Sequence, residues 1–160
     1  MNIYVYTGPV KSGKTTKLMQ WASDQKNIDG IFQPVVDGKR YIYHIGSRTL
    51  KMLETQSEKS NEEILEIGEY RFLKNTFSWC QKILKDCLNK NIEWLIIDEV
   101  GPLELKGKGL EPGITELLNS KNNFSGNVVF VVRDSMLEKF VEHYKLDNKY
   151  DLINQKLFCL

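Results

Sequence analysis

Three runs of apolar residues without a polar interruption indicate buried strands in this chain. They are residues 3–6 (IYVY), 94–97 (WLII) and 128–132 (VVFVV), and the first of them ends at a Thr-Gly pair. Continuous apolar runs are typical of strands that are covered on both faces, as in a parallel sheet. We therefore predict a mainly parallel central sheet that contains all three segments.

Apolar residues at helical spacing occur between and after these strands. Residues 18–22 carry an apolar face, and residues 114–118 and 136–144 also have helical character. The clearest helix is marked by apolar positions three and four residues apart, namely Phe77, Cys80, Ile83, Leu84, Cys87 and Leu88. Because both cysteines fall on this apolar stripe, we expect them to pack in the core.

A β-hairpin is predicted between the first helix and the helix that begins near residue 77. Residues 31–36 and 39–45 flank Asp37-Gly38, a dipeptide that suits the positive φ angles of a two-residue turn. Residues 54–63 contain almost no apolar side chains and are predicted to form a solvated loop. The succession of strands and helices predicts an α/β fold with helices on both faces of the sheet.

Length and composition fit one folded domain over residues 1–160. The 41% hydrophobic and 27% charged residues exclude a disordered or collagen-like protein. The net charge is only +1 and acids separate the lysines, which gives no support to nucleic-acid binding as a main function. No apolar run approaches the roughly 20 residues of a membrane span, and the cysteines form no CxxC pair. We expect a cytoplasmic protein with no membrane partner, and the sequence leaves a protein partner open.

The candidate chemistry begins at residues 8–15 (GPVKSGKT), which match the phosphate-binding pattern GxxxxGK[ST] between a predicted strand and a predicted helix. Such a loop points backbone N–H groups and a helix N-terminus at phosphate oxygens. We expect Lys14 to contact the β and γ phosphates, Thr15 to bind Mg²⁺ and Thr16 to offer its backbone N–H. The predicted nucleotide-binding residues are Gly8, Pro9, Val10, Lys11, Ser12, Gly13, Lys14, Thr15 and Thr16.

Two acids directly follow the apolar run at residues 94–97. Asp98 is expected at the carboxyl end of a buried strand, where open α/β sheets bind ligands, and there it supports Mg²⁺. Glu99 is placed to orient and partly deprotonate a water that attacks the γ phosphate, which is the chemistry of hydrolysis. The alternative interpretation of Glu99 is a solvated acid at a strand end.

Arginines supply candidate cations for the γ phosphate. Arg133 ends the apolar run at residues 128–132, on the edge of the sheet that also carries Gly8 and Asp98. We predict that it stabilises negative charge on the γ phosphate, and a surface salt bridge is the alternative. Arg40 is a weaker candidate on the same charge argument. The predicted catalytic residues are therefore Lys14, Glu99 and Arg133.

The chain resembles the THEP1-type nucleoside triphosphatases, which combine a phosphate loop with a stretch that reads DE(I/V)GP(M/L)E. Residues 98–104 read DEVGPLE here, and the resemblance extends to Gly30, residues 38–40 and 67–70, and the VVFVVR strand. It implies a three-layer, RecA-like P-loop NTPase fold with a hairpin insertion. It also implies Mg²⁺-dependent hydrolysis of nucleoside triphosphates, including ATP and GTP, to diphosphates.

Some residues of this stretch and of the loop leave questions open. Glu104 matches the family stretch, but a loop ion pair explains it equally well. Lys11 stands where such proteins often have glycine, and Lys39 stands where a second arginine is common. Neither departure involves the predicted catalytic or metal-binding residues.

Two other classes of protein share parts of this pattern. Residues 98–101 also fit the DxxG pattern of GTP-dependent switches, and residues 148–151 (NKYD) fit their guanine-reading NKxD pattern. A guanine-reading motif ends a buried strand, however, whereas the preceding residues 138–144 are helix-like. A small-molecule or nucleotide kinase needs an acceptor site and an arginine-bearing lid, and the four arginines of this chain are not clustered.

Overall fold

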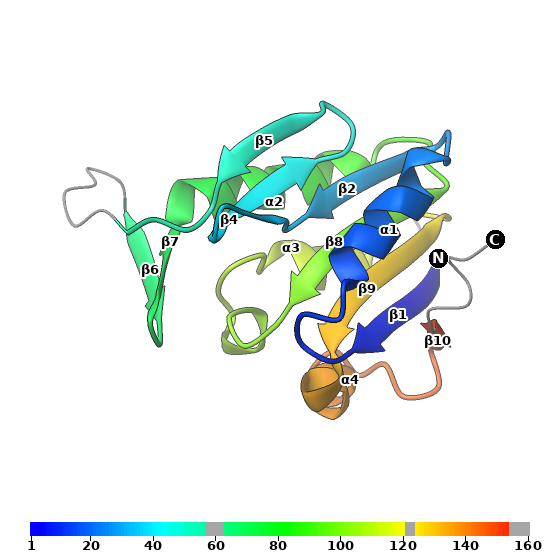
Figure 1. Cartoon of the computed structure of the whole chain (residues 1–160). Helices are drawn as coiled ribbons and strands as arrows, with labels where there is room; N and C mark the ends of the chain where they lie inside the picture. The colour runs from blue at the N-terminus through cyan, green and yellow to red at the C-terminus, as the bar shows by residue number, and fades with distance from the viewer. Residues whose placement is uncertain (57–62, 121–123, 154–160) are drawn as a thin grey trace.

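The computed structural model describes residues 1–56, 63–120 and 124–153. Its strands are β1 (Asn2–Gly8), β2 (Ile28–Phe32), β3 (Val35–Val36), β4 (Lys39–His44), β5 (Thr49–Met52), β6 (Ile64–Ile67), β7 (Tyr70–Leu73), β8 (Trp94–Val100), β9 (Asn127–Arg133) and β10 (Asp151–Ile153). Its α-helices are α1 (Lys14–Ser23), α2 (Lys74–Cys87), α3 (Gly113–Asn119) and α4 (Leu137–His143). Figure 1 shows these elements around one large sheet.

The main sheet is mostly parallel. Among the described residues, its neighbouring parallel strands follow the order β10-β1-β9-β8-β2. Strand β4 pairs antiparallel with β2, and β3 and β5 pair antiparallel with β4. The parallel strands all end at one edge of the sheet, so the segments that follow β1, β8 and β9 lie close together. Open α/β sheets bind their ligands at such an edge.

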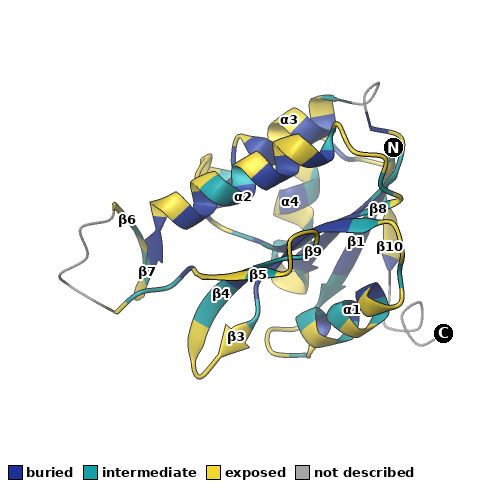
Figure 2. Ribbon diagram, turned by 90° about the horizontal axis from the view of Figure 1, so that it is seen from above, coloured by how far each residue is buried: buried dark blue, intermediate teal, exposed yellow. Residues whose placement is uncertain are grey.

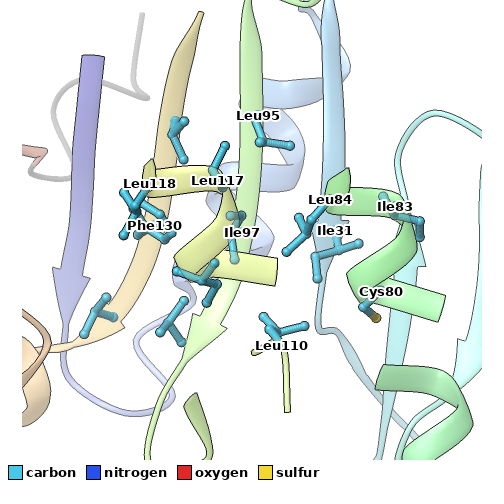
Figure 3. Packing of buried hydrophobic residues seen from close by; sticks show 14 of the residues in the cluster. Ile31, Cys80, Ile83, Leu84, Leu95, Ile97, Leu110, Leu117, Leu118 and Phe130 are labelled. Carbon is cyan, nitrogen blue, oxygen red and sulfur yellow. The ribbon is translucent and has the colours of Figure 1, made fainter. Parts of the chain in front are cut away.

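Helices cover both faces of this sheet. Figure 2 shows α2, α3 and α4 on one face and α1 on the other, so the predicted layered α/β fold is confirmed. The larger group of buried apolar side chains lies under α2, α3 and α4 and includes Leu117 and Phe130 (Figure 3). The smaller group lies under α1 and includes Leu18. In β8, Ile97 belongs to the larger group and Ile96 to the smaller one, which explains why its apolar run is continuous.

The predicted helices and the predicted position of the cysteines are confirmed. Helices α1 to α4 overlap the four segments with helical spacing, and a 3-10 turn (Asp134–Met136) leads into α4. Cys80 and Cys87 are fully buried on α2, and burial raises the pKa of each thiol to about 12. In the described part of the chain, no helix combines the length and the apolar character that a membrane crossing requires.

The predicted hairpin is confirmed, but its first strand is interrupted. Asp37 and Gly38 have positive φ angles of 48° and 76°, as a two-residue turn between β3 and β4 requires. Residues 31–36 do not form one strand, because β2 ends at Phe32 and β3 begins at Val35. Pro34 lies in the break, and proline cannot donate a hydrogen bond within a central strand. Both pieces pair with β4 in one continuous register, and residues 28–31 also pair with β8 in the parallel part of the sheet.

A second hairpin, β6–β7, was not predicted as secondary structure. Its strands pair antiparallel in a separate two-stranded sheet, and in Figure 1 this hairpin stands apart from the main sheet. Of the predicted loop at residues 54–63, residues 57–62 lie outside the described residues. Glu54, at the start of that loop, forms an isolated β-bridge with Phe72 of β7. The hairpin is therefore attached to the domain both by this bridge and by its direct connection to α2.

Candidate active site

The phosphate-binding loop, hereafter the P-loop, comprises residues 8–15 and connects β1 to α1 as predicted. Gly13 precedes the first turn of α1 with a φ of 78°, and Lys11 also has a positive φ, of 58°. Within the described part of the chain, no side chain caps the N-terminus of α1. Because the first N–H groups of a helix have no partner within it, this end of α1 offers hydrogen-bond donors and a positive dipole to an anion.

A cavity of about 410 Å³ opens beside the P-loop and is called the P-loop cavity here. Residues 10–16 form one wall, and the opposite wall includes Gln33, Arg40, Glu99 and Arg133. The structure thus brings Lys14, Glu99 and Arg133, the predicted catalytic residues, to one cavity. Gly8 and Pro9, which were predicted to contact nucleotide, are not part of its wall.

Lys14 is buried within the P-loop. Its Nζ donates hydrogen bonds to Gly8 O at 2.9 Å, to Pro9 O at 2.6 Å and to Ser12 Oγ at 3.4 Å. These acceptors are all neutral, so they hold the ammonium group in place without cancelling its charge. The P-loop therefore presents both a cation and helix N–H groups to the P-loop cavity, which is the requirement for binding a phosphate.

Asp98 lies in β8 and is completely buried. Its Oδ2 accepts hydrogen bonds from Thr15 Oγ1 at 2.8 Å and from the backbone N–H of Gln33 at 3.0 Å. Gln33 Nε2 in turn donates to the backbone oxygen of Asp98 at 3.1 Å. Burial raises the pKa of Asp98 to about 6, although both hydrogen bonds to the carboxylate act in the opposite direction. Thr15 and Asp98, the two predicted metal ligands, are thus hydrogen-bonded to each other.

Gln33 is a residue of this site that the sequence analysis missed. It directly follows β2, the neighbour of β8 in the sheet. The available signal was its position, since it is the first polar residue after the apolar end of β2. That signal depends on knowing that β2 ends at Phe32 and lies beside β8, and the predicted strand ran through Gln33 without a break.

Glu99 occupies an irregular position in β8. The pairing of β8 with β9 shifts between Ile97 and Val100, so a β-bulge contains Asp98 and Glu99. Glu99 has a positive φ of 61°, which turns the chain within the strand. The side chain of Glu99 is 25% exposed and lines the P-loop cavity, whereas Asp98 is enclosed. The two adjacent carboxylates therefore have different surroundings and can serve different roles.

Arg133 forms an ion pair with Glu99 at the wall of the P-loop cavity. Its Nη2 and Nε donate to Glu99 Oε1 at 2.7 Å and 3.0 Å. Both side chains are partly exposed, 33% for Arg133 and 25% for Glu99. The structure therefore contains the salt bridge that was the alternative interpretation of Arg133. The same geometry also places the guanidinium at the cavity where a γ phosphate is expected.

A family model described as NTPase matches residues 2–156 of the chain. The chain belongs to this NTPase family. It is therefore an enzyme of the nucleoside-triphosphatase class, and the resemblance derived from the sequence motifs is confirmed. No curated protein matches the chain in a direct search.

Two solved structures of nucleoside triphosphatases have the same fold as this NTPase. The solution structure of a human cancer-related nucleoside triphosphatase has a TM-score of 0.70 and 18% identity, with 99% of this chain and 94% of that chain covered. The crystal structure of THEP1 from the hyperthermophile Aquifex aeolicus has a TM-score of 0.71 and 20% identity, with 97% and 90% covered. At these identities the likeness establishes a common fold.

Arg40 and Glu104 of the NTPase contact different parts of the structure. Arg40 lines the P-loop cavity, with its guanidinium 5.5 Å from the ring centre of Tyr70 and its Nε 3.9 Å from Glu54. Glu104 is buried, and its two carboxylate oxygens accept backbone N–H groups from Gly101 at 2.9 Å and Leu110 at 3.1 Å. Glu104 therefore closes the loop formed by residues 101–110 with hydrogen bonds rather than with an ion pair. Burial raises its pKa to about 7.

The NKxD pattern of the NTPase lies far from the P-loop end of the sheet. Asn148 lies between α4 and β10, so it does not end a strand. This agrees with the expectation that the preceding residues are helical. Asp151 pairs with Tyr4, near the start of β1, whereas the P-loop begins at Gly8, where β1 ends. The pattern therefore sits toward the amino end of the parallel strands, away from the cavity that the P-loop lines.

Proposed function

We propose that this NTPase hydrolyses nucleoside triphosphates, ATP and GTP among them, to nucleoside diphosphates and phosphate in a Mg²⁺-dependent reaction. The observation that carries the proposal is the position of Glu99. Its carboxylate lines the same cavity as the P-loop, while the neighbouring Asp98 is committed to Thr15 and Gln33. A carboxylate that faces the phosphate cavity is the group that hydrolysis requires to activate water.

Binding of the triphosphate rests on the P-loop. Lys14 and the N–H groups at the start of α1 face the phosphates, and Arg133 and Arg40 line the opposite side of the cavity. Positive groups on both sides of a transferred phosphoryl group stabilise the charge that it carries in the transition state. Arg133 is paired with Glu99 at the wall of this cavity. On this proposal it moves from Glu99 to the γ phosphate when substrate arrives.

Asp98 and Thr15 are the residues that fit a Mg²⁺ ion. Among the described residues, Asp98 Oδ1 is buried without a hydrogen-bond partner, and the Thr15 hydroxyl lies 2.8 Å from Oδ2. Nucleotide-bound Mg²⁺ is usually held by one or two protein oxygens together with waters and phosphates. When bound, the ion would neutralise negative charge on the β and γ phosphates. The unpartnered oxygen of Asp98 is thus suited to support such an ion.

The chemical step on this proposal begins with water beside Glu99. The water oxygen forms a bond to the γ phosphorus as the bond between that phosphorus and its bridging oxygen breaks. The water proton moves to Glu99, and the diphosphate leaves with the electron pair of the broken bond. Arg133 and Lys14 stabilise the charge that develops on the oxygens around the phosphorus.

The proposal is tested by phosphate release from ATP, GTP, CTP and UTP, with Mg²⁺ and without any acceptor. Release from several of the four supports the hydrolase. Strict dependence on GTP supports a GTP-dependent switch, and absence of release until an acceptor is added supports a kinase. Omitting Mg²⁺ from the same assay measures its contribution directly.

Variants of the adjacent acids separate catalysis from binding. Glu99→Gln keeps the shape of the side chain but removes the base, so we expect hydrolysis to fall by roughly 10²-fold while nucleotide affinity is retained. Asp98→Asn removes a charge proposed to support Mg²⁺, so we expect weaker Mg²⁺-dependent binding. The exposed Glu138 on α4 provides the matched control, since Glu138→Gln makes the same chemical change away from the cavity. Wild-type hydrolysis by Glu99→Gln contradicts the proposed base.

A further inference from the structure

A second cavity of about 250 Å³ adjoins the P-loop cavity and is called the apolar cavity here. Its walls are formed mainly by apolar side chains, namely Ile67, Phe72, Phe77, Pro102 and Leu103. The two cavities share wall residues, because Glu99, Arg133, Gln33, Arg40 and Tyr70 line both of them. The apolar cavity therefore begins where the proposed catalytic pair Glu99–Arg133 lies, on the side away from the P-loop.

The wall of the apolar cavity is built from well-packed elements. Phe72 of β7 stacks on Tyr70 with ring centres 6.0 Å apart, and it contacts Phe77 of α2 edge to face at 5.9 Å. Phe72 and Phe77 are buried, with 7% and 4% of their surface exposed. Across the cavity, Leu103 belongs to the 101–110 loop, which Glu104 holds through two backbone hydrogen bonds. A preformed apolar pocket with a few polar groups at one end is the usual form of a small-molecule site.

The charged groups at the polar end of the apolar cavity are paired. Arg133 bonds to Glu99, and Arg40 lies 3.9 Å from Glu54. The carboxylate oxygens of Glu104 are both engaged by backbone N–H groups. On the proposed function Arg133 leaves Glu99 only for the γ phosphate, so a second charged ligand would enter a mostly apolar space in which each described charged group already has a partner, and this is unfavourable. An uncharged ligand with one group able to donate a hydrogen bond to Glu99 fits better.

The volume of the apolar cavity limits the size of such a ligand. An apolar cavity of about 150 Å³ is sufficient to bind benzene. The apolar cavity, at about 250 Å³, therefore accommodates a single ring with a short substituent. Phe72, Phe77 and Glu99 all line this cavity, so the ring can contact the aromatic wall while the substituent faces the carboxylate.

We propose that the apolar cavity is a second ligand site, which binds a small uncharged alcohol with a compact apolar body. The body lies among Ile67, Phe72 and Phe77, and the hydroxyl group donates a hydrogen bond to Glu99. If the proposed function holds, this hydroxyl takes the position of the attacking water, so an occupied site slows hydrolysis. Binding of the alcohol itself does not rest on the proposed function.

Benzyl alcohol is a suitable probe, with toluene as the analogue that lacks the hydroxyl group. Binding to the nucleotide-free chain is measured by titration followed through backbone amide chemical shifts. We expect a dissociation constant in the millimolar range, as is usual for a ligand this small. The shifts are expected at the amides of Gly68 and Gly101, which line the cavity. Toluene is expected to bind several-fold more weakly, because it offers no donor to Glu99.

Two matched substitutions in β6 locate the site. Ile67 lines the apolar cavity whereas Ile64 of the same strand does not, so Ile67→Trp fills the cavity and Ile64→Trp serves as the control. We expect Ile67→Trp to weaken benzyl alcohol binding at least tenfold and Ile64→Trp to leave it unchanged. Circular dichroism establishes that each variant folds, and the amide shift map of the wild type locates the site without any substitution.

Several results overturn this proposal. One is that the wild type does not bind benzyl alcohol up to its solubility limit. Another is that the amide shifts occur far from Gly68 and Gly101, and a third is that a folded Ile67→Trp variant binds benzyl alcohol as well as the wild type does. Competition by ADP assigns the cavity to the nucleotide itself and also overturns it. The proposed function is tested separately by the phosphate-release assay without alcohol. If the proposed function is wrong, the chain releases no phosphate in that assay. If hydrolysis is present, benzyl alcohol is expected to inhibit it over the concentration range in which it binds.

Discussion

Glu104 gives the stability of this NTPase a pH dependence whose size follows from the structure. The carboxylate is only 3% exposed, and burial raises its pKa from 4.5 to about 7. In the unfolded chain the carboxyl group loses its proton near its ordinary pKa, whereas in the folded chain it keeps the proton up to about pH 7. The folded state binds the extra proton between these values, so stability falls as pH rises through this window. The difference corresponds to about 3 kcal/mol.

Glu104→Gln removes this titration. An amide is uncharged at every pH, so the variant lacks the decline in stability that Glu104 causes. Its side chain has a single acceptor oxygen for the two backbone N–H groups of Gly101 and Leu110, which costs about 1–3 kcal/mol at all pH values. We therefore expect Glu104→Gln to be less stable than the wild type at pH 5. Between pH 5 and pH 8 it recovers about 2.5 kcal/mol relative to the wild type, because part of the decline has already occurred at pH 5.

Urea unfolding of both proteins at several pH values between 5 and 8 measures this change. Contributions from other titrating groups, including Asp98, are common to both proteins and cancel in the difference. Glu116→Gln on α3 is the matched control, because it neutralises an exposed glutamate. If the difference between Glu104→Gln and the wild type stays constant from pH 5 to 8, the buried carboxyl does not titrate as described and the reasoning is refuted.

Three further predictions concern the P-loop, the cavity and the sheet. Lys14→Ala removes the cation that faces the phosphates, so affinity for triphosphate and turnover are both expected to be lost while circular dichroism shows an intact fold. Arg133→Ala should lower kcat far more than it raises KM if the guanidinium acts mainly in the transition state, and an unchanged kcat would leave only the ion pair with Glu99. Gly30→Ala places a Cβ 2.1 Å from Ile96 O at a φ of 121°, so thermal unfolding should show a loss of about 3 kcal/mol or more. Gly38→Ala, with a φ of 76° but open space around the Cβ, is the control and should cost about 1 kcal/mol.

The positions in the candidate site that the sequence predicted are those specified by neighbouring residues. The P-loop pattern is contiguous, and it lies between a strand and a helix whose hydrophobic periods are themselves local signals. Asp98 was expected near Thr15 because the ends of parallel strands share one edge of the sheet, and the 2.8 Å hydrogen bond between them agrees with that expectation. Local patterns and the rules of parallel sheets were sufficient for these residues.

The parts that were missed depend on contacts between distant segments. Gln33 joins the site because β2 lies beside β8 and ends at Phe32, which the prediction of an unbroken strand over residues 31–36 did not indicate. The β6–β7 hairpin has strands of four residues each, and its packing on Phe77 of α2 is a tertiary interaction. A salt bridge was the alternative expected for Arg133, but its partner Glu99 follows from the register of β8 and β9, which includes a bulge. No hydrophobic periodicity or sequence motif predicts any of these features.

The backbone at Glu99 has a consequence for the way this enzyme can evolve or be engineered. A residue other than glycine at a φ of 61° raises the free energy of the folded state by about 1–2 kcal/mol, and an ion pair as exposed as Glu99–Arg133 returns at most about 1 kcal/mol. Selection for stability alone therefore favours glycine or asparagine at this position. On the proposed function it is selection for activity that retains the glutamate, so a library ranked by melting temperature alone would select against the proposed base.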